Sequence, residues 1–279
     1  MQTNILKALA NLQKVKGFSL PEIYSGSNRI NNMGIALEYF VKDAFCDSHM
    51  LKNLADKDKA YSKLLSYIGN ANNPPDFIVR GGDAVEVKKI QSSKSGLALN
   101  SSCPKNRLYL DDPLITEACR QCEEWDEKDI IYTVGVVADG SINLLWFVYG
   151  DCYAADRKVY ESARNKIISG IQGINSIEFS ETRELGRVNK VDPLGITYLR
   201  VRGMWGIENP TKVFSYLNFK QESTPSILAL MRKQKFDSFP ENDRAILEKL
   251  SNVQLSEVEI KDPNNPAKFI KAKAIKISY

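Results

Sequence analysis

Two acidic residues and a lysine lie on either side of a predicted turn in the first third of the chain. Asp76 begins one run of branched and aromatic residues, Glu86-Val87-Lys88 lies in the next, and Gly81-Gly82-Asp83 separates the runs. This pattern predicts a β-hairpin, in which side chains alternate so that Glu86 and Lys88 share one face. Asp76 enters at the start of the first strand and is expected to meet them.

Two carboxylates and a lysine at one sheet edge could support metal-assisted phosphodiester hydrolysis. Carboxylate oxygens are ligands that Mg²⁺ prefers, and a cation is needed near the attacking water or the scissile phosphate. The simpler alternative is a solvated strand face with ordinary charge alternation, because a single Glu-x-Lys pattern is short and common.

The composition is that of an ordinary globular protein. With 279 residues, 43% hydrophobic and 26% charged, the chain can bury a large core, and we predict a single domain over residues 1–279. The net charge of +4 is compatible with a polyanionic partner without requiring one. No stretch approaches the roughly 20 apolar residues of a membrane helix, and the N-terminus lacks a signal-peptide pattern, so we expect no membrane contact and a cytoplasmic location.

Cysteine and histidine usage excludes several kinds of site. Five cysteines at irregular spacing argue against a disulfide framework and favour a reducing compartment. Cys119 and Cys122 lack the second pair that a four-cysteine zinc site needs, so we interpret them as buried or half-buried thiols. His49 is the single histidine and has no catalytic neighbours in the sequence, so we predict that it lies on the surface.

Hydrophobic spacing predicts an α/β fold in which an α+β mixed sheet is flanked by helices. We expect helices at 3–16, 33–45, 55–68, 113–125 and 151–171, and strands at 77–80, 84–90, 130–137 and 142–149. In the last of these helices Tyr160, Ala163, Ile167 and Ile168 are expected to face inward. We place the catalytic core at about 30–172, a DNA-recognition region at about 180–220, and two helices followed by a hairpin within 225–279.

Two polar segments could contact nucleic acid. The hydroxyl-rich segment 92–107 beside the hairpin is either a surface loop or a source of phosphate contacts, from Lys94, Ser101, Ser102, Lys105 and Arg107. Further along, Arg200 and Arg202 alternate with apolar residues, so on a strand both guanidinium groups face one way. Such forks suit guanine in the major groove as well as phosphate, although a solvated basic face is the simpler alternative.

The spacing of Pro75-Asp76 and Glu86-Val87-Lys88 resembles that of the PD-(D/E)xK nuclease superfamily. Longer blocks resemble the NgoPII type of Type II restriction endonuclease, and the similarity extends over most of the chain. These blocks are Asn72-Asn73-Pro74-Pro75-Asp76, Gly82 to Gln91, Ala98-Leu99-Asn100-Ser101-Ser102, Thr116-Glu117-Ala118-Cys119-Arg120, Leu185-Gly186-Arg187-Val188-Asn189 and Asp192-Pro193-Leu194-Gly195.

The resemblance implies Mg²⁺-dependent cleavage of double-stranded DNA at a short palindrome, GGCC, by a homodimer. It implies that Asp76 and Glu86 bind Mg²⁺, and that Lys88 orients or helps deprotonate the attacking water and stabilises the developing charge. Glu38, in the helix before the hairpin, would be an accessory carboxylate or else a solvated flank. The candidates for DNA recognition are Asn100, Arg187, Asn189, Lys190, Arg200 and Arg202.

Two rival hypotheses remain at this point. A repair or recombination nuclease of the same fold would recognise DNA structure in place of sequence. A DNA-binding protein that does no chemistry would have no reason to keep Asp76, Glu86 and Lys88 together, so their joint presence argues against it.

Overall fold

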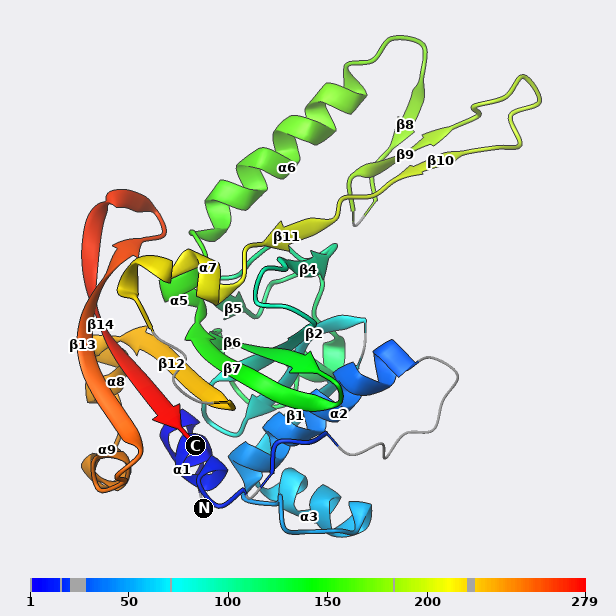
Figure 1. The fold of residues 1–279 in the computed structure, drawn as a ribbon. Coiled ribbons are helices and arrows are strands. Elements are labelled where there is room, and N and C mark those ends of the chain that lie inside the picture. The colour runs from blue at the N-terminus through cyan, green and yellow to red at the C-terminus, as the bar shows by residue number, and fades with distance from the viewer. Residues whose placement is uncertain (1, 16, 21–28, 71, 183, 220–223) are drawn as a thin grey trace.

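A large mixed sheet forms the centre of the protein (Figure 1). The computed structural model describes residues 2–15, 17–20, 29–70, 72–182, 184–219 and 224–279, with only the backbone described at 29–32. Along the sheet the strand order is β1-β2-β3-β6-β7-β12-β14-β13, and β5 pairs with β6. The bounds are β1 Leu65–Asn70, β2 Asn73–Val79, β3 Ala84–Ile90, β5 Arg107–Tyr109, β6 Glu127–Ala138, β7 Ser141–Tyr149, β12 Ser226–Arg232, β13 Val253–Asp262 and β14 Asn265–Ser278.

The mixed character of the sheet confirms the predicted fold class. Strand β3 runs parallel to β6, and β12 runs parallel to β7, whereas the other neighbouring strands are antiparallel. The helices are α1 Ile5–Leu12, α2 Arg29–Cys46, α3 Leu54–Leu64, α4 Glu117–Arg120, α5 Gly150–Tyr153, α6 Arg157–Gln172, α7 Pro210–Val213, α8 Lys233–Ser238 and α9 Glu241–Glu248, with a 3₁₀ turn at Ser215–Leu217. Of the described helices, none is long and apolar enough to cross a membrane.

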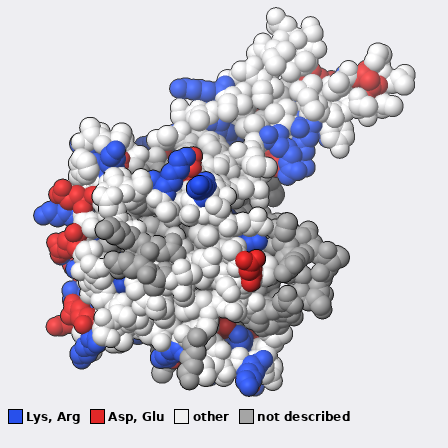
Figure 2. All heavy atoms as spheres, in the orientation of Figure 1, with Lys and Arg blue, Asp and Glu red and all other residues white. Residues whose placement is uncertain are grey.

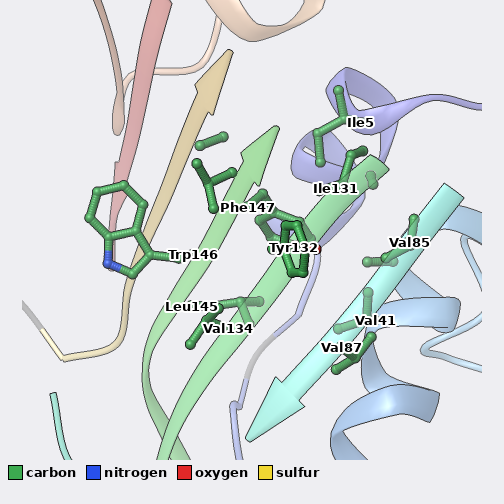
Figure 3. Packing of buried hydrophobic residues seen from close by; sticks show 14 of the residues in the cluster. Ile5, Val41, Val85, Val87, Ile131, Tyr132, Val134, Leu145, Trp146 and Phe147 are labelled. Carbon is green, nitrogen blue, oxygen red and sulfur yellow. The ribbon is translucent and has the colours of Figure 1, made fainter. Parts of the chain in front are cut away.

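Helices α1 and α2 cover one face of the sheet. Figure 3 shows Ile5 of α1 and Val41 of α2 beside strands β3, β6 and β7. Both side chains are fully buried, and Asn4 caps α1 by accepting from the backbone N–H groups of Leu6 and Lys7. On the opposite face the buried indole of Trp146 donates to Thr211 of α7 at 3.0 Å. The two helices on the first face fix the strands that carry the acidic residues.

The predicted hairpin at the acidic pair is present. Phe77 pairs with Val85 and Ile78 with Ala84 in an antiparallel register. The turn closes through a hydrogen bond from the Val79 N–H to the Asp83 carbonyl, and Gly81 takes a φ of 64°, which glycine adopts without strain. The local sequence signal was therefore sufficient here.

An arm projects from the body of the molecule (Figure 1). It consists of α6 and a small antiparallel sheet of β8 Glu178–Ser180, β9 Gly186–Asn189 and β10 Leu199–Val201. Strand β11 Trp205–Ile207 pairs with β4 Leu97–Asn100 and so joins the arm to the body. The strands of the arm lie in the region where we placed DNA recognition.

The prediction that one face of α6 packs inward is wrong. None of its residues is buried, and Ile167 is 49% exposed, because the helix runs along the arm instead of across the central sheet. The four side chains expected to face inward were those of Tyr160, Ala163, Ile167 and Ile168. Tyr160 does make a tertiary contact, packing edge-on against Trp205 with the ring centroids 5.7 Å apart.

Other helix predictions fail where tertiary pairing overrides local pattern. The helix expected at 55–68 ends at Leu64, since the following residues pair with β2 as an edge strand. Instead of a helix over 113–125 there is one short turn, α4, because Arg120 donates to three backbone carbonyls of a folded loop.

The apolar run in β12 is buried in the sheet, and the two expected helices, α8 and α9, follow it. Such runs cannot be distinguished from buried helix by periodicity.

The histidine prediction is also wrong, whereas the thiol prediction is confirmed. The His49 side chain is 13% exposed and its ring lies 4.7 Å from that of Phe40. Burial, followed by the charge of Lys57, lowers the pKa of His49 to about 4 against the opposing charge of Asp43. Cys119 is buried, Cys122 is half-buried, and both are free thiols.

Candidate active site

The hairpin and the base of the arm enclose a cleft of ≈ 720 Å³. Its lining brings together residues from β1, β2, β3, the end of β4 and the residues after it, the turn between β8 and β9, and β10 with the residues that follow it. Eight of the residues singled out in the sequence line it: Asp76, Glu86, Lys88, Asn100, Ser101, Ser102, Arg200 and Arg202. Segments more than a hundred residues apart in the chain therefore meet at one surface.

Pairing of β2 with β3 brings the acidic residues together. The Val87 N–H donates to Asp76 Oδ2 at 2.6 Å, and the Lys88 ammonium donates to Glu86 Oε1 at 2.6 Å. Glu86 Oε2 is buried and has no hydrogen-bond partner. A buried acceptor without a partner is costly, so this oxygen is suited to bind a cation.

The charges in the cluster shift each other's pKa. Burial raises the pKa of Asp76 well above its usual range, and the charges of Glu86 and Glu38 add to this against the attraction of Lys88. Burial lowers the pKa of Lys88, but the charges of the Glu86 and Asp76 carboxylates outweigh burial and raise this pKa above its usual value. Without a metal ion, the lysine is therefore a cation and cannot accept a proton.

The donor set fits Mg²⁺ better than zinc. Mg²⁺ takes oxygen ligands, usually one or two carboxylates, and keeps several waters or binds substrate phosphates. Asp76 and Glu86 provide two carboxylates that line the cleft, one of them with the unpartnered Glu86 oxygen. Within the described ranges, no three or more His, Cys, Asp or Glu side chains form a metal-binding group, so the closed site typical of structural zinc is absent there.

Glu38 lies close to this cluster but outside the cleft lining. Its carboxylate forms an ion pair with Lys42 one helical turn away, with Nζ and Oε1 3.1 Å apart. Its charge nevertheless contributes to the raised pKa of Asp76. The geometry gives Glu38 an electrostatic influence on the acidic pair and no direct contact with it.

Across the cleft, Arg200 and Arg202 both bind one carboxylate, that of Glu184. Arg202 Nε lies 2.9 Å from Glu184 Oε1, and Arg200 Nε lies 3.2 Å from Oε2. The Glu184 side chain is only 8% exposed. Sequence reasoning missed this residue, and the available signal was an acidic residue in an arginine-rich, glycine-rich segment.

Two of the predicted phosphate contacts lie elsewhere. Lys105 is buried and pairs with Asp112, and Arg107 on β5 pairs with Glu127 and, at 2.5 Å, with Asp129. Both line a neighbouring cavity of ≈ 350 Å³. Their charges are compensated by carboxylates that the sequence did not place beside them.

The remaining candidates lie outside the cleft lining. On the arm, the Arg187 guanidinium stacks 3.7 Å from the centre of the Tyr198 ring, Asn189 donates to Ser180, and Lys190 pairs with Glu178. Lys94 is exposed in the turn after β3. Figure 2 shows Lys and Arg side chains gathered near the base of the arm, above the body.

Comparison with known proteins gives a family and one close relative. A family model described as NgoPII restriction endonuclease matches residues 3–262. The Type II restriction enzyme NgoPII of Neisseria gonorrhoeae is 47% identical over 275 residues, which cover 98% of this chain and 98% of that protein. No solved structure matches the chain.

Proposed function

The chain belongs to the NgoPII restriction endonuclease family, and from this membership we propose that it hydrolyses both strands of duplex DNA at a short palindrome, GGCC, with Mg²⁺ as cofactor. Type II site-specific endonuclease activity follows from the similarity over nearly the whole chain. The observation that supports the metal-dependent cleavage of DNA is the cleft that Asp76, Glu86 and Lys88 line together with Arg200 and Arg202, whereas the GGCC palindrome rests on the family alone.

In this proposal Asp76, Glu86 and Lys88 form a PD-(D/E)xK centre. Asp76 and Glu86 would hold the metal, which would supply Lewis-acid chemistry when bound. Glu86 positions the Lys88 ammonium through the 2.6 Å hydrogen bond. The ammonium orients the attacking water and stabilises negative charge that develops on the scissile phosphate.

The opposite wall of the cleft would bind the DNA. Arg200 and Arg202 provide guanidinium forks for guanine O6 and N7 or for phosphate, and a GGCC site presents guanines on both strands. Asn100, Ser101 and Ser102, from the body side, supply neutral donors and acceptors to the same cleft. A palindrome is matched by a two-fold protein dimer, so each protomer would cut one strand.

The test is digestion of plasmid DNA by the purified protein with Mg²⁺ and with EDTA, followed by sequencing of the ends. We expect discrete fragments, formed only with Mg²⁺, whose termini all derive from GGCC. Cutting at junctions or free ends without a common sequence would support a repair nuclease instead. Intact DNA with retained binding would support a protein that does no chemistry.

A further inference from the structure

Glu184 is the centre of a polar network that joins the two walls of the cleft. Its Oε1 accepts from Ser101 Oγ at 3.0 Å, and its carboxylate also binds Arg202 through Nε and Nη2, each at 2.9 Å. Arg200 Nε completes the set at 3.2 Å. One carboxylate thus holds a hydroxyl from the body and two guanidinium groups from the arm.

The backbone of Glu184 is held as well. Its carbonyl accepts from Arg164 of α6, and its N–H donates to Thr182 Oγ1 at 3.2 Å. The carboxylate is therefore attached to a backbone position fixed from two sides. It can fix the orientation of the side chains that bind it, because its own position is fixed.

Among the described residues, the Arg202 guanidinium bonds to Glu184 alone, and the Arg202 side chain is 61% exposed. Arginine carries five N–H donors in a planar fork. Nε donates to both Glu184 carboxylate oxygens, and Nη2 forms an ion pair with Oε1 at 2.9 Å. The far edge of the guanidinium, formed by Nη1 and Nη2, can then offer two parallel N–H groups, which is the geometry that binds guanine O6 and N7.

We propose that Glu184 is a positioning residue that presents Arg200 and Arg202 to the DNA and thereby sets how strictly the enzyme discriminates its site from near-matches. This inference rests on the proposed function, since it deepens the role of the same cleft. Glu184 does not touch the reacting atoms, which lie beside Asp76 and Glu86 on the other wall.

A second consequence is electrostatic. Hydrogen bonds from Arg202, aided by Ser101 and the charge of Arg200, hold the pKa of Glu184 below its usual range, so it is an anion at neutral pH. It offsets part of the positive charge of the two arginines. Removing it should raise the attraction of the cleft for any phosphate backbone while loosening the arginines.

The test compares the wild-type protein with Glu184→Gln, which preserves side-chain size and removes the charge. The wild type is first shown to cut one palindrome, since failure there would reject the proposed function and not this inference alone. Cleavage rates are then measured on the cognate duplex and on duplexes with one changed base pair. Binding is measured with Ca²⁺ on cognate and random DNA.

For Glu184→Gln we expect the ratio of cognate to near-cognate kcat/KM to fall about tenfold or more. Random DNA should bind more tightly, and kcat on saturating cognate DNA should stay within a few-fold. Glu161→Gln is the matched control, because Glu161 pairs with Arg157 on the arm and does not line this cleft. It should leave the ratio unchanged.

A purely structural role predicts something different. Then kcat and thermal stability would fall together, the specificity ratio would be unchanged, and the inference would be wrong. If Glu184→Gln fails to fold, Arg202→Lys and the Ser101→Ala variant provide the second route. Each variant should lower the specificity ratio. Their effects on this ratio should be less than multiplicative when the two substitutions are combined, because both act through one network. Fully multiplicative effects would also reject the inference.

Discussion

At the scale of single residues, the acidic cluster has the negative charge and the unpartnered oxygen that a cation site would need. Asp76 is half-buried near the buried Glu86, and one Glu86 oxygen has no hydrogen-bond partner among the described residues. Lys88 compensates only part of this negative charge. A bound cation would offset the free-energy cost of the buried, unpartnered oxygen, whereas the interpretation as a solvated strand face does not account for it.

Lys88 is expected to act on the chemical step. Replacing it as Lys88→Ala should lower single-turnover cleavage by roughly 10²–10³-fold, since a charge aimed at the transition state is removed. Binding of cognate DNA in Ca²⁺ should stay within a few-fold. Lys89→Ala is the control, because Lys89 follows on the other face of β3. Loss of binding without loss of the chemical rate would contradict the assignment.

The raised pKa of Asp76 gives a stability prediction with a definite sign. The folded protein keeps the Asp76 proton at pH values where the unfolded chain has released it. The metal-free protein therefore loses free energy of unfolding as the pH rises from the ordinary carboxyl pKa of 3.8 through the raised value. Mg²⁺ needs the carboxylate form, so stabilisation by Mg²⁺ should grow over the same pH range.

Thermal unfolding with and without Mg²⁺ measures this effect. At pH 8, Mg²⁺ at about 100 times its Kd should add about 2.7 kcal/mol to the stability of the wild type. Asp76→Asn should be at least as stable as the wild type without metal and should gain little from Mg²⁺. Asp139→Asn makes the same chemical change at an exposed turn and should respond as the wild type does. Equal Mg²⁺ shifts in all three proteins would exclude Asp76 as a ligand.

The residues that could be predicted from the sequence are those with local signals. Asp76, Glu86 and Lys88 were placed by a hairpin whose turn residues are contiguous. Lys105 could not be placed, because the carboxylate that neutralises it is set beside it only by the folded loop. Glu184 was missed for the same reason, since the arm sheet brings Arg200 and Arg202 to it and the pairing of β11 with β4 brings Ser101 to it.

At the scale of elements, helix α2 is anchored by a buried polar network. Asp43 accepts from Ser48 at 2.6 Å, from Tyr61 at 2.7 Å and from Lys57 at 2.5 Å. These contacts attach α2 to α3, and α2 in turn packs against β3, which carries Glu86 and Lys88. The network therefore holds α2 in the position from which it packs against β3.

Removing Asp43 should destabilise the protein without changing its chemistry. Asp43→Ala leaves the buried Lys57 without its counter-charge, so we expect a loss of about 3–5 kcal/mol in urea unfolding. Asp56→Ala in the neighbouring helix removes an exposed ion pair with Lys59 and should change stability by less than about 1 kcal/mol. Similar losses in both variants would refute the proposed anchoring.

Element prediction failed where partners distant in sequence decide the structure. The residues of β1 and β12 were assigned to helices, yet both are strands because β2, and β7 with β14, offer hydrogen bonds that local propensity does not reveal. Strands β6 and β7 were predicted correctly because both are long apolar runs joined by a tight turn containing Gly140.

At the scale of the whole molecule, the arm is a projecting unit with an exposed surface. Helix α6 has no buried residue, and Leu194 and Ile196 at the far end of the arm are 81% and 75% exposed. The inner end of the arm forms one wall of the cleft. An arm of this kind is suited to follow a duplex that lies in the cleft.

A palindromic site predicts two protomers on one duplex. Sedimentation of the protein with a short duplex containing one GGCC, in Ca²⁺ to prevent cleavage, should give a complex with twice the 31.4 kDa protomer mass plus the DNA. A duplex of the same length without the site is the control and should not give this complex at the same protein concentration. A saturated complex with one protomer would contradict the homodimer.

The measurement that bears most directly on the central claim is single-turnover cleavage of a duplex with one GGCC by the wild type and by Asp76→Asn, with Mg²⁺ and with EDTA. We expect both strands to be cut within the site by the wild type with Mg²⁺ alone, and the Asp76→Asn rate to be at least about a hundredfold lower although the variant still binds the duplex. Undiminished cleavage by Asp76→Asn, or cleavage by the wild type in EDTA, would contradict the account.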